Sequence, residues 1–85
     1  MFKMDDRRIK EIIAGHVDIA LNVNDIKSGD FLDNIGINSI NFIRIVIEIE
    51  NEFGISFDVD YLGFEVYENI QALLDYVSSL KQSSM

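Results

Sequence analysis

The sequence predicts an all-α domain, and two observations support that class. Apolar residues recur at helical spacing in three separate segments, residues 5–20, 39–53 and 70–77. The β-branched run from Ile45 to Ile47 favours a strand locally, but its segment is too long for a common strand and its polar residues do not alternate. The 85 residues fit one small domain, which buries only about 60% of its unfolded surface and has no room for a deep enzyme cleft.

A first helix is predicted for residues 5–20. Its apolar face consists of Ile9, Ile12, Ile13, His16, Val17 and Ala20. Asp5 and Asp6 stand near its start, where the helix dipole favours acidic side chains. His16 has no nearby carboxylate or second ligand in this pattern, and such a histidine is more often packed than catalytic or metal-bound. We therefore assign it no role.

Residues 22–37 are predicted to form a long loop of turn-favouring residues. Five spaced apolar residues should anchor it to the core: Val23, Ile26, Phe31, Leu32 and Ile35. Loops longer than about 12–15 residues are uncommon in compact domains and are usually functional when they are ordered. Gly36 should make a turn that brings the loop onto the next helix. We therefore expect the loop to position Ser39.

A second helix is predicted from Ser39 to Phe53, ended by Gly54 in the left-handed conformation. On a helical wheel its side chains form three groups. They are a core stripe of Phe42, Ile45, Val46, Ile49 and Phe53, a polar arc of Asn41, Arg44, Glu48, Asn51 and Glu52, and an isoleucine strip of Ile40, Ile43 and Ile47. The strip is either a docking surface, with Glu50 beside it supplying charge, or a face covered by another helix, and the projection leaves both interpretations open.

The remainder of the chain predicts a short helical turn around residues 59–64 and a last helix. In that helix the apolar residues at helical spacing are Ile70, Leu73, Leu74 and Val77. Residues 81–85 should form a frayed tail. No repeat or linker is visible, so residues 1–85 are interpreted as a single domain with a core at about 5–80.

Charge and composition argue against several classes of function. The net charge of -8 and the pI near 4.3 would repel nucleic acid and anionic membranes, so a basic protein surface is the expected partner. The absence of cysteine excludes disulfides and thiolate metal sites. Asp58 and Asp60 have the first spacing of a calcium loop but lack its glycine and terminal glutamate, so no metal is expected. No signal peptide or span of ~20 apolar residues is seen, and we expect a cytoplasmic protein.

Ser39 is the residue of greatest chemical interest. It stands at the predicted start of a helix, where unpaired backbone N–H groups and the helix dipole favour phosphate. A serine there is also a common helix cap, and on position alone capping is the more frequent role. Position therefore leaves both roles open.

Three segments resemble the acyl carrier protein family. They are residues 32–40 (LDNIGINSI), 49–55 (IENEFGI) and 70–77 (IQALLDYV). The first is similar to the stretch in which an Asp-Ser-Leu signature opens the family's second helix, the second to the Glu-Phe segment that closes it, and the third to the last helix. The resemblance runs from about Ile9 to Val77, in the family's order.

The resemblance implies a small four-helix bundle of three main helices and a short third helix. It implies that Ser39, with Asn38 as its signature neighbour, carries 4′-phosphopantetheine as a phosphodiester. The chain would be a monomeric, stand-alone, non-enzymatic carrier that holds acyl or aminoacyl groups as thioesters on that cofactor, for fatty-acid, polyketide or nonribosomal peptide type biosynthesis. Its expected partners are a phosphopantetheinyl transferase, a loading enzyme and a downstream synthase or transferase. They would dock on a surface consisting of Ile40, Ile43, Arg44, Ile47 and Glu50.

The chain departs from the family pattern at two residues. Asn38 replaces the usual aspartate, which assists the modifying transferase, commonly through its magnesium ion; asparagine keeps an oxygen but loses the charge. Arg44 places a cation in a helix that is generally acidic in the family. It either forms a local ion pair with Glu48 or helps to determine which partners bind. Both departures suggest a specialised pathway, such as peptide, polyketide or D-alanyl carriage.

Two functions of other classes remain as alternatives. The first is an unmodified helical interaction domain that keeps the carrier fold. The second is a small acid-base enzyme, which lacks support because the sequence shows no paired carboxylate and histidine arrangement.

Overall fold

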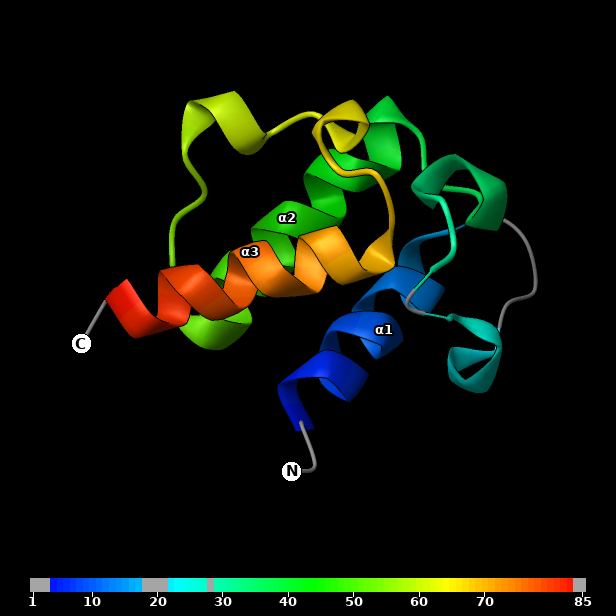
Figure 1. The fold of residues 1–85 in the computed structure, drawn as a ribbon, viewed down its shortest axis with the longest axis horizontal. Coiled ribbons are helices and arrows are strands. Elements are labelled where there is room, and N and C mark those ends of the chain that lie inside the picture. Colours follow the sequence, from blue (N-terminus) through cyan, green and yellow to red (C-terminus); the bar gives the residue numbers. More distant parts are fainter. Residues whose placement is uncertain (1–3, 18–21, 28, 84–85) are drawn as a thin grey trace.

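A computed structural model describes residues 4–17, 22–27 and 29–83. It contains three α-helices, α1 (Met4–His16), α2 (Ser39–Phe53) and α3 (Ile70–Ser83), and four 3₁₀ turns, η1 (Val23–Asp25), η2 (Leu32–Ile35), η3 (Val59–Tyr61) and η4 (Phe64–Val66) (Figure 1). No strand occurs in this described part of the chain. The all-α prediction is therefore confirmed, whereas the short third helix is represented by the separate turns η3 and η4.

The first helix is shorter than predicted over its described length. α1 ends at His16 and Val17 follows as a bend, while residues 18–20, the rest of the predicted helix, lie outside the described residues. Its isoleucines at 9, 12 and 13 are buried, as the periodicity indicated. The expectation that no carboxylate lies near His16 was wrong, because its Nε2 lies 2.6 Å from Oε1 of Glu48. The carboxylate comes from α2, so sequence proximity could not reveal it.

The second helix has the predicted bounds. Gly54 ends it in the left-handed conformation, with φ 67° and ψ 38°, and its N–H donates to the Glu50 carbonyl at 2.8 Å. The core stripe is confirmed, with Phe42, Ile45, Val46 and Ile49 buried and Phe53 partly buried against them. The isoleucine strip is exposed, by 71% for Ile40, 43% for Ile43 and 51% for Ile47, which argues against the covered interpretation and leaves the docking role a prediction. No helix of the described chain covers the strip.

The loop that precedes α2 lies at one end of the bundle, beside the start of that helix (Figure 1). It is anchored by buried Ile26, Leu32, Ile35 and Ile37, with Val23 partly buried. The carbonyl of Asp30 accepts the N–H of Ile70 at 2.9 Å, which connects the loop to the first residue of α3. Phe31 was wrongly predicted as an anchor, because it is exposed while the adjacent Leu32 takes the core position at the start of η2.

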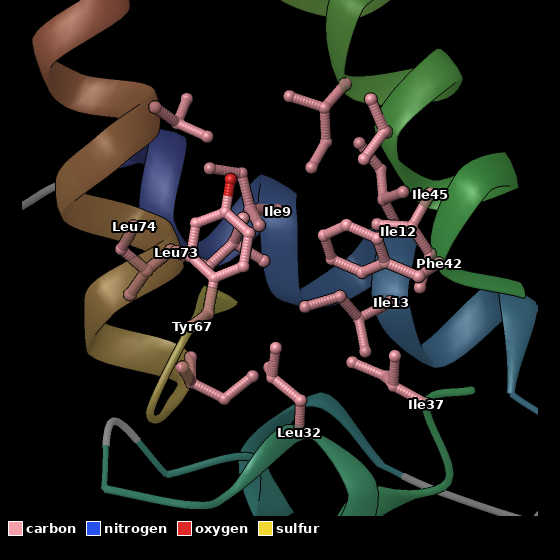
Figure 2. Packing of buried hydrophobic residues seen from close by; sticks show 14 of the residues in the cluster. Ile9, Ile12, Ile13, Leu32, Ile37, Phe42, Ile45, Tyr67, Leu73 and Leu74 are labelled. Atoms are coloured by element: carbon pink, nitrogen blue, oxygen red, sulfur yellow. The ribbon is translucent and has the colours of Figure 1, made fainter. Parts of the chain in front are cut away.

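Tyr67 fills the centre of the core between α2 and α3. Its ring faces Phe42 across the cluster, with 5.7 Å between the ring centroids (Figure 2). The Tyr67 hydroxyl donates to the Tyr61 carbonyl at 2.8 Å, and Tyr61 stacks on Tyr76 at 4.2 Å. Burial raises the pKa of Tyr67 well above its usual value, so the phenol remains a neutral donor at any physiological pH. These contacts fasten η3 and its neighbouring segments to α3.

The last helix continues beyond its predicted end. α3 reaches Ser83, so residues 81–83 are helical rather than part of a frayed tail, and residues 84–85 lie outside the described residues. The extension is packed, since Leu80 is partly buried against the core and the Lys81 Nζ lies 4.9 Å from the Phe53 ring centroid. A cation over an aromatic face is attractive, which favours the added turn.

The two apolar faces of α2 predict opposite responses to truncation. Ile49→Ala should lower the free energy of unfolding by about 2–5 kcal/mol, because it leaves a cavity at a fully buried position. Ile43→Ala, the same change on the exposed strip of the same helix, should alter it by no more than about 0.5 kcal/mol. Urea denaturation of both variants measures the difference. Equal losses would mean that Ile43 contributes to the core.

Candidate modification site

The start of α2 is capped by Asn38, not by Ser39. Asn38 has extended backbone angles, φ -131° and ψ -178°, and its side-chain oxygen accepts the N–H groups of Ile40 and Asn41, each at 3.0 Å. This geometry satisfies two of the helix's unpaired donors. The capping explanation for Ser39 is therefore wrong, because the residue before it performs that role.

Asn41 completes the cap from within the helix. Its Oδ1 accepts the Asn38 N–H at 2.6 Å, and its Nδ2 donates to the Gly36 carbonyl at 2.9 Å. The helical wheel placed Asn41 in the polar arc, but its side chain is only 7% exposed. The wheel failed because these hydrogen bonds satisfy the amide and offset its burial. The Asn-x-x-Asn spacing from residue 38 resembles a capping box and could have revealed the pair.

Gly36 makes the predicted turn into this junction. Its φ of 91° and ψ of 10° lie in the left-handed region, which glycine adopts without steric cost. The next residue, Ile37, donates its N–H to the Leu32 carbonyl at 3.1 Å and buries its side chain. The turn therefore directs the chain from the anchored loop into Asn38.

Ser39 is left as the first residue of α2 with an exposed side chain. Neither its hydroxyl nor its N–H has a hydrogen-bond partner among the described residues. The positive end of the helix dipole lies at this position and favours a negatively charged group. An accessible hydroxyl next to an unpaired donor at a helix start can form a phosphate ester and stabilise its charge.

The isoleucine strip begins directly after Ser39 and follows the outer face of α2. Arg44 is exposed at its side, and no group in the described ranges forms an ion pair with it. The proposed local pair with Glu48 is wrong, since Glu48 contacts His16 at 2.6 Å and Arg8 at 3.9 Å. The strip therefore has an uncompensated cation along one edge.

The acidic residues of α2 are engaged within the molecule. Glu52 pairs with Arg8 at 3.2 Å, and this hydrogen-bonded pair raises the pKa of Arg8. Glu50, expected to supply charge to the docking surface, accepts the Phe57 N–H at 2.7 Å and so holds the segment after α2. Its docking role stays a prediction, with a structural role now added.

Neither a cluster of metal-ligating side chains nor a membrane-spanning helix is found among the described residues. No group of three or more histidine, aspartate or glutamate side chains among them is arranged to hold a metal ion. Asp58, which we considered for calcium, accepts the Asp60 N–H at 3.1 Å and caps η3. None of the helices over the described ranges is long and apolar enough to cross a membrane.

Comparison with known families gives an independent result. The model of a family described as "Phosphopantetheine attachment site" matches residues 7–77. The match covers most of the chain, from α1 through most of α3, and includes the exposed serine at the start of α2.

The cap assignment predicts different effects for two adjacent substitutions. Asn38→Ala should lower the free energy of unfolding by about 1 kcal/mol, because it removes the acceptor of two helical N–H groups. Ser39→Ala should change it by no more than about 0.5 kcal/mol, since the hydroxyl forms no hydrogen bond in the described structure. Thermal and urea unfolding of the two variants test this. A larger loss of unfolding free energy for Ser39→Ala than for Asn38→Ala would mean that Ser39, not Asn38, caps α2.

Proposed function

The chain belongs to the phosphopantetheine attachment site family, and from that premise we propose that Ser39 is the residue that carries the cofactor. Members of this family hold a covalently attached 4′-phosphopantetheine and act as carrier proteins rather than as catalysts. The observation that supports Ser39 is its exposed hydroxyl, which remains without a partner because Asn38 supplies the cap. The start of α2 thus provides an accessible nucleophile without losing helix stability.

The residues around Ser39 fit a phosphodiester. Its own N–H is unpaired among the described groups and lies at the positive end of the α2 dipole. Glu48 and Glu52 are held by partners from α1, so neither is an unpaired anion on the same helix. When bound, the cofactor supplies a terminal thiol that this cysteine-free chain lacks.

The proposed cargo is an acyl or aminoacyl group held as a thioester. A phosphopantetheinyl transferase would attach the cofactor, a loading enzyme would add the cargo, and a synthase or transferase would remove it. Carrier domains of this family work with such enzymes. The departures at Asn38 and Arg44 favour a specialised pathway, such as peptide, polyketide or D-alanyl carriage, over ordinary fatty-acid biosynthesis.

We also propose that these enzymes dock on the isoleucine strip together with Arg44 and Glu50. Three exposed isoleucines next to the modified serine form an apolar surface that a partner can cover. The net charge of -8 favours basic partners over long range and opposes self-association, consistent with a monomer. Arg44 adds local selection, because a cation directly opposite it would be repelled, whereas an acidic or polar group would be accepted.

The alternative function is an unmodified interaction domain that uses the same strip. Exposure of Ile40, Ile43 and Ile47 supports docking with or without a cofactor. What distinguishes the two functions is the reactivity of Ser39.

Coexpression with a broad-specificity phosphopantetheinyl transferase should add one phosphopantetheine to the chain. Intact-protein mass spectrometry should show the addition, and Ser39→Ala should abolish it. Ser56→Ala, which removes another exposed serine, should leave it unchanged. If a transferase that modifies a control carrier protein modifies neither the parent chain nor its Asn38→Asp variant, the interaction domain is supported instead.

Docking on the strip predicts that Ile43→Glu slows modification without unfolding the chain. Its kcat/KM with the transferase should fall by about tenfold or more, because a carboxylate would be buried unpaired at the interface. Val59→Glu is the matched control, since it places the same charge at an exposed apolar residue outside α2. Circular dichroism checks that both variants fold. Equal kcat/KM values for Ile43→Glu and Val59→Glu would mean that the strip is not part of the docking surface.

A further inference from the structure

The amide of Asn38 has only one orientation compatible with its contacts. The N–H groups of Ile40 and Asn41 both point at the same side-chain atom, each at 3.0 Å. Two donors require an acceptor, so that atom is Oδ1 and the NH₂ group must occupy the other branch of the amide. Asn38 is exposed, and no group in the described part of the chain accepts a hydrogen bond from its Nδ2.

This orientation changes the comparison between asparagine and aspartate at residue 38. A carboxylate has two acceptor oxygens, so one could cap α2 while the other remained available beside Ser39. Asparagine retains a single oxygen, and the cap occupies it with two hydrogen bonds. The group that remains available to a partner is therefore the NH₂ group of Asn38. It is a hydrogen-bond donor, whereas the second oxygen of an aspartate would be an acceptor.

The NH₂ group of Asn38 lies beside the atom that would be modified, so the chemistry of the transfer to Ser39 decides what this donor can do. The serine oxygen forms a bond to the β-phosphorus of coenzyme A, the bond from that phosphorus to the bridging oxygen breaks, and the nucleotide leaves with the electron pair. The serine proton passes to a base of the transferase. Divalent cations stabilise the charge that develops in such transfers, and Mg²⁺ binds oxygen ligands rather than an amide NH₂.

We infer that Asn38 determines which transferase modifies this chain, by offering an amide donor and no metal ligand beside Ser39. A suitable transferase supplies all the protein ligands of its own metal ion and places a hydrogen-bond acceptor opposite Nδ2. This inference rests on the proposed function, because it requires that Ser39 be the acceptor. Asn38 thereby has two roles, as helix cap through Oδ1 and as specificity determinant through Nδ2.

The test compares the parent chain with Asn38→Asp and Asn38→Ser. Both substitutes are good N-caps, so all three proteins should unfold at similar temperatures. Coenzyme A and a broad-specificity, Mg²⁺-dependent phosphopantetheinyl transferase are used, and the rate is followed by intact mass over a range of Mg²⁺ concentrations. Asn38→Asp should raise kcat/KM by about tenfold and lower the Mg²⁺ concentration that gives half the maximal rate. Asn38→Ser, which has neither a carboxylate nor an amide, should keep the parent's Mg²⁺ requirement.

The outcomes separate this inference from the proposed function. If the parent is modified but Asn38→Asp changes neither the rate nor the Mg²⁺ requirement, the inference is overturned and Ser39 remains the attachment site. If only Asn38→Asp is modified, the inference is supported. If neither is modified by a transferase that modifies a control carrier protein, the assignment of Ser39 fails and the inference fails with it. A purely structural role of Asn38 would not shift the Mg²⁺ requirement.

Discussion

A reciprocal pair of hydrogen bonds between Asn38 and Asn41 fixes the junction on which the site depends. Asn38 closes the first turn of α2 and Asn41 holds the preceding chain through the Asn38 N–H and the Gly36 carbonyl. Because Asn38 accepts the N–H groups at the start of the helix, Ser39 is not needed as a cap. The accessibility of its hydroxyl thus follows from the cap. The cap also sets where α2 begins, and therefore where the isoleucine strip lies relative to that hydroxyl.

The periodic segments of the chain were predictable, but the contacts between them were not. The spacing of apolar residues gave the full length of α2, and Gly54 marked its end because few other residues accept the left-handed conformation. The burial of Asn41 was missed because a wheel ranks side chains by polarity and ignores whether hydrogen bonds satisfy them. The contact between His16 and Glu48 was missed because it joins residues 32 positions apart. The pattern of apolar residues also predicted both Phe31 and Leu32 as anchors, whereas only Leu32 is buried.

The two sides of α2 differ because its glutamates contact other parts of the molecule. Two of its carboxylates contact basic groups of α1, and that of Glu50 binds the Phe57 N–H, so all three contribute to the arrangement of the fold. On the helical wheel Glu48 and Glu52 lay in the polar arc and Glu50 lay beside the isoleucine strip, with no indication of these contacts. With these charges engaged, the outer side of α2 is defined by isoleucine and by Arg44.

The exposed isoleucine strip also has a consequence for the solution behaviour of the chain. A contiguous apolar surface on a 9.7 kDa protein is a site at which copies can associate. The excess negative charge counters this by mutual repulsion, which at physiological salt acts over a Debye length of about 8 Å. The acidity of the sequence thus favours colloidal stability, because like charges keep concentrated copies apart. The charge of the chain therefore offsets the tendency of the exposed isoleucine strip to bind a second copy.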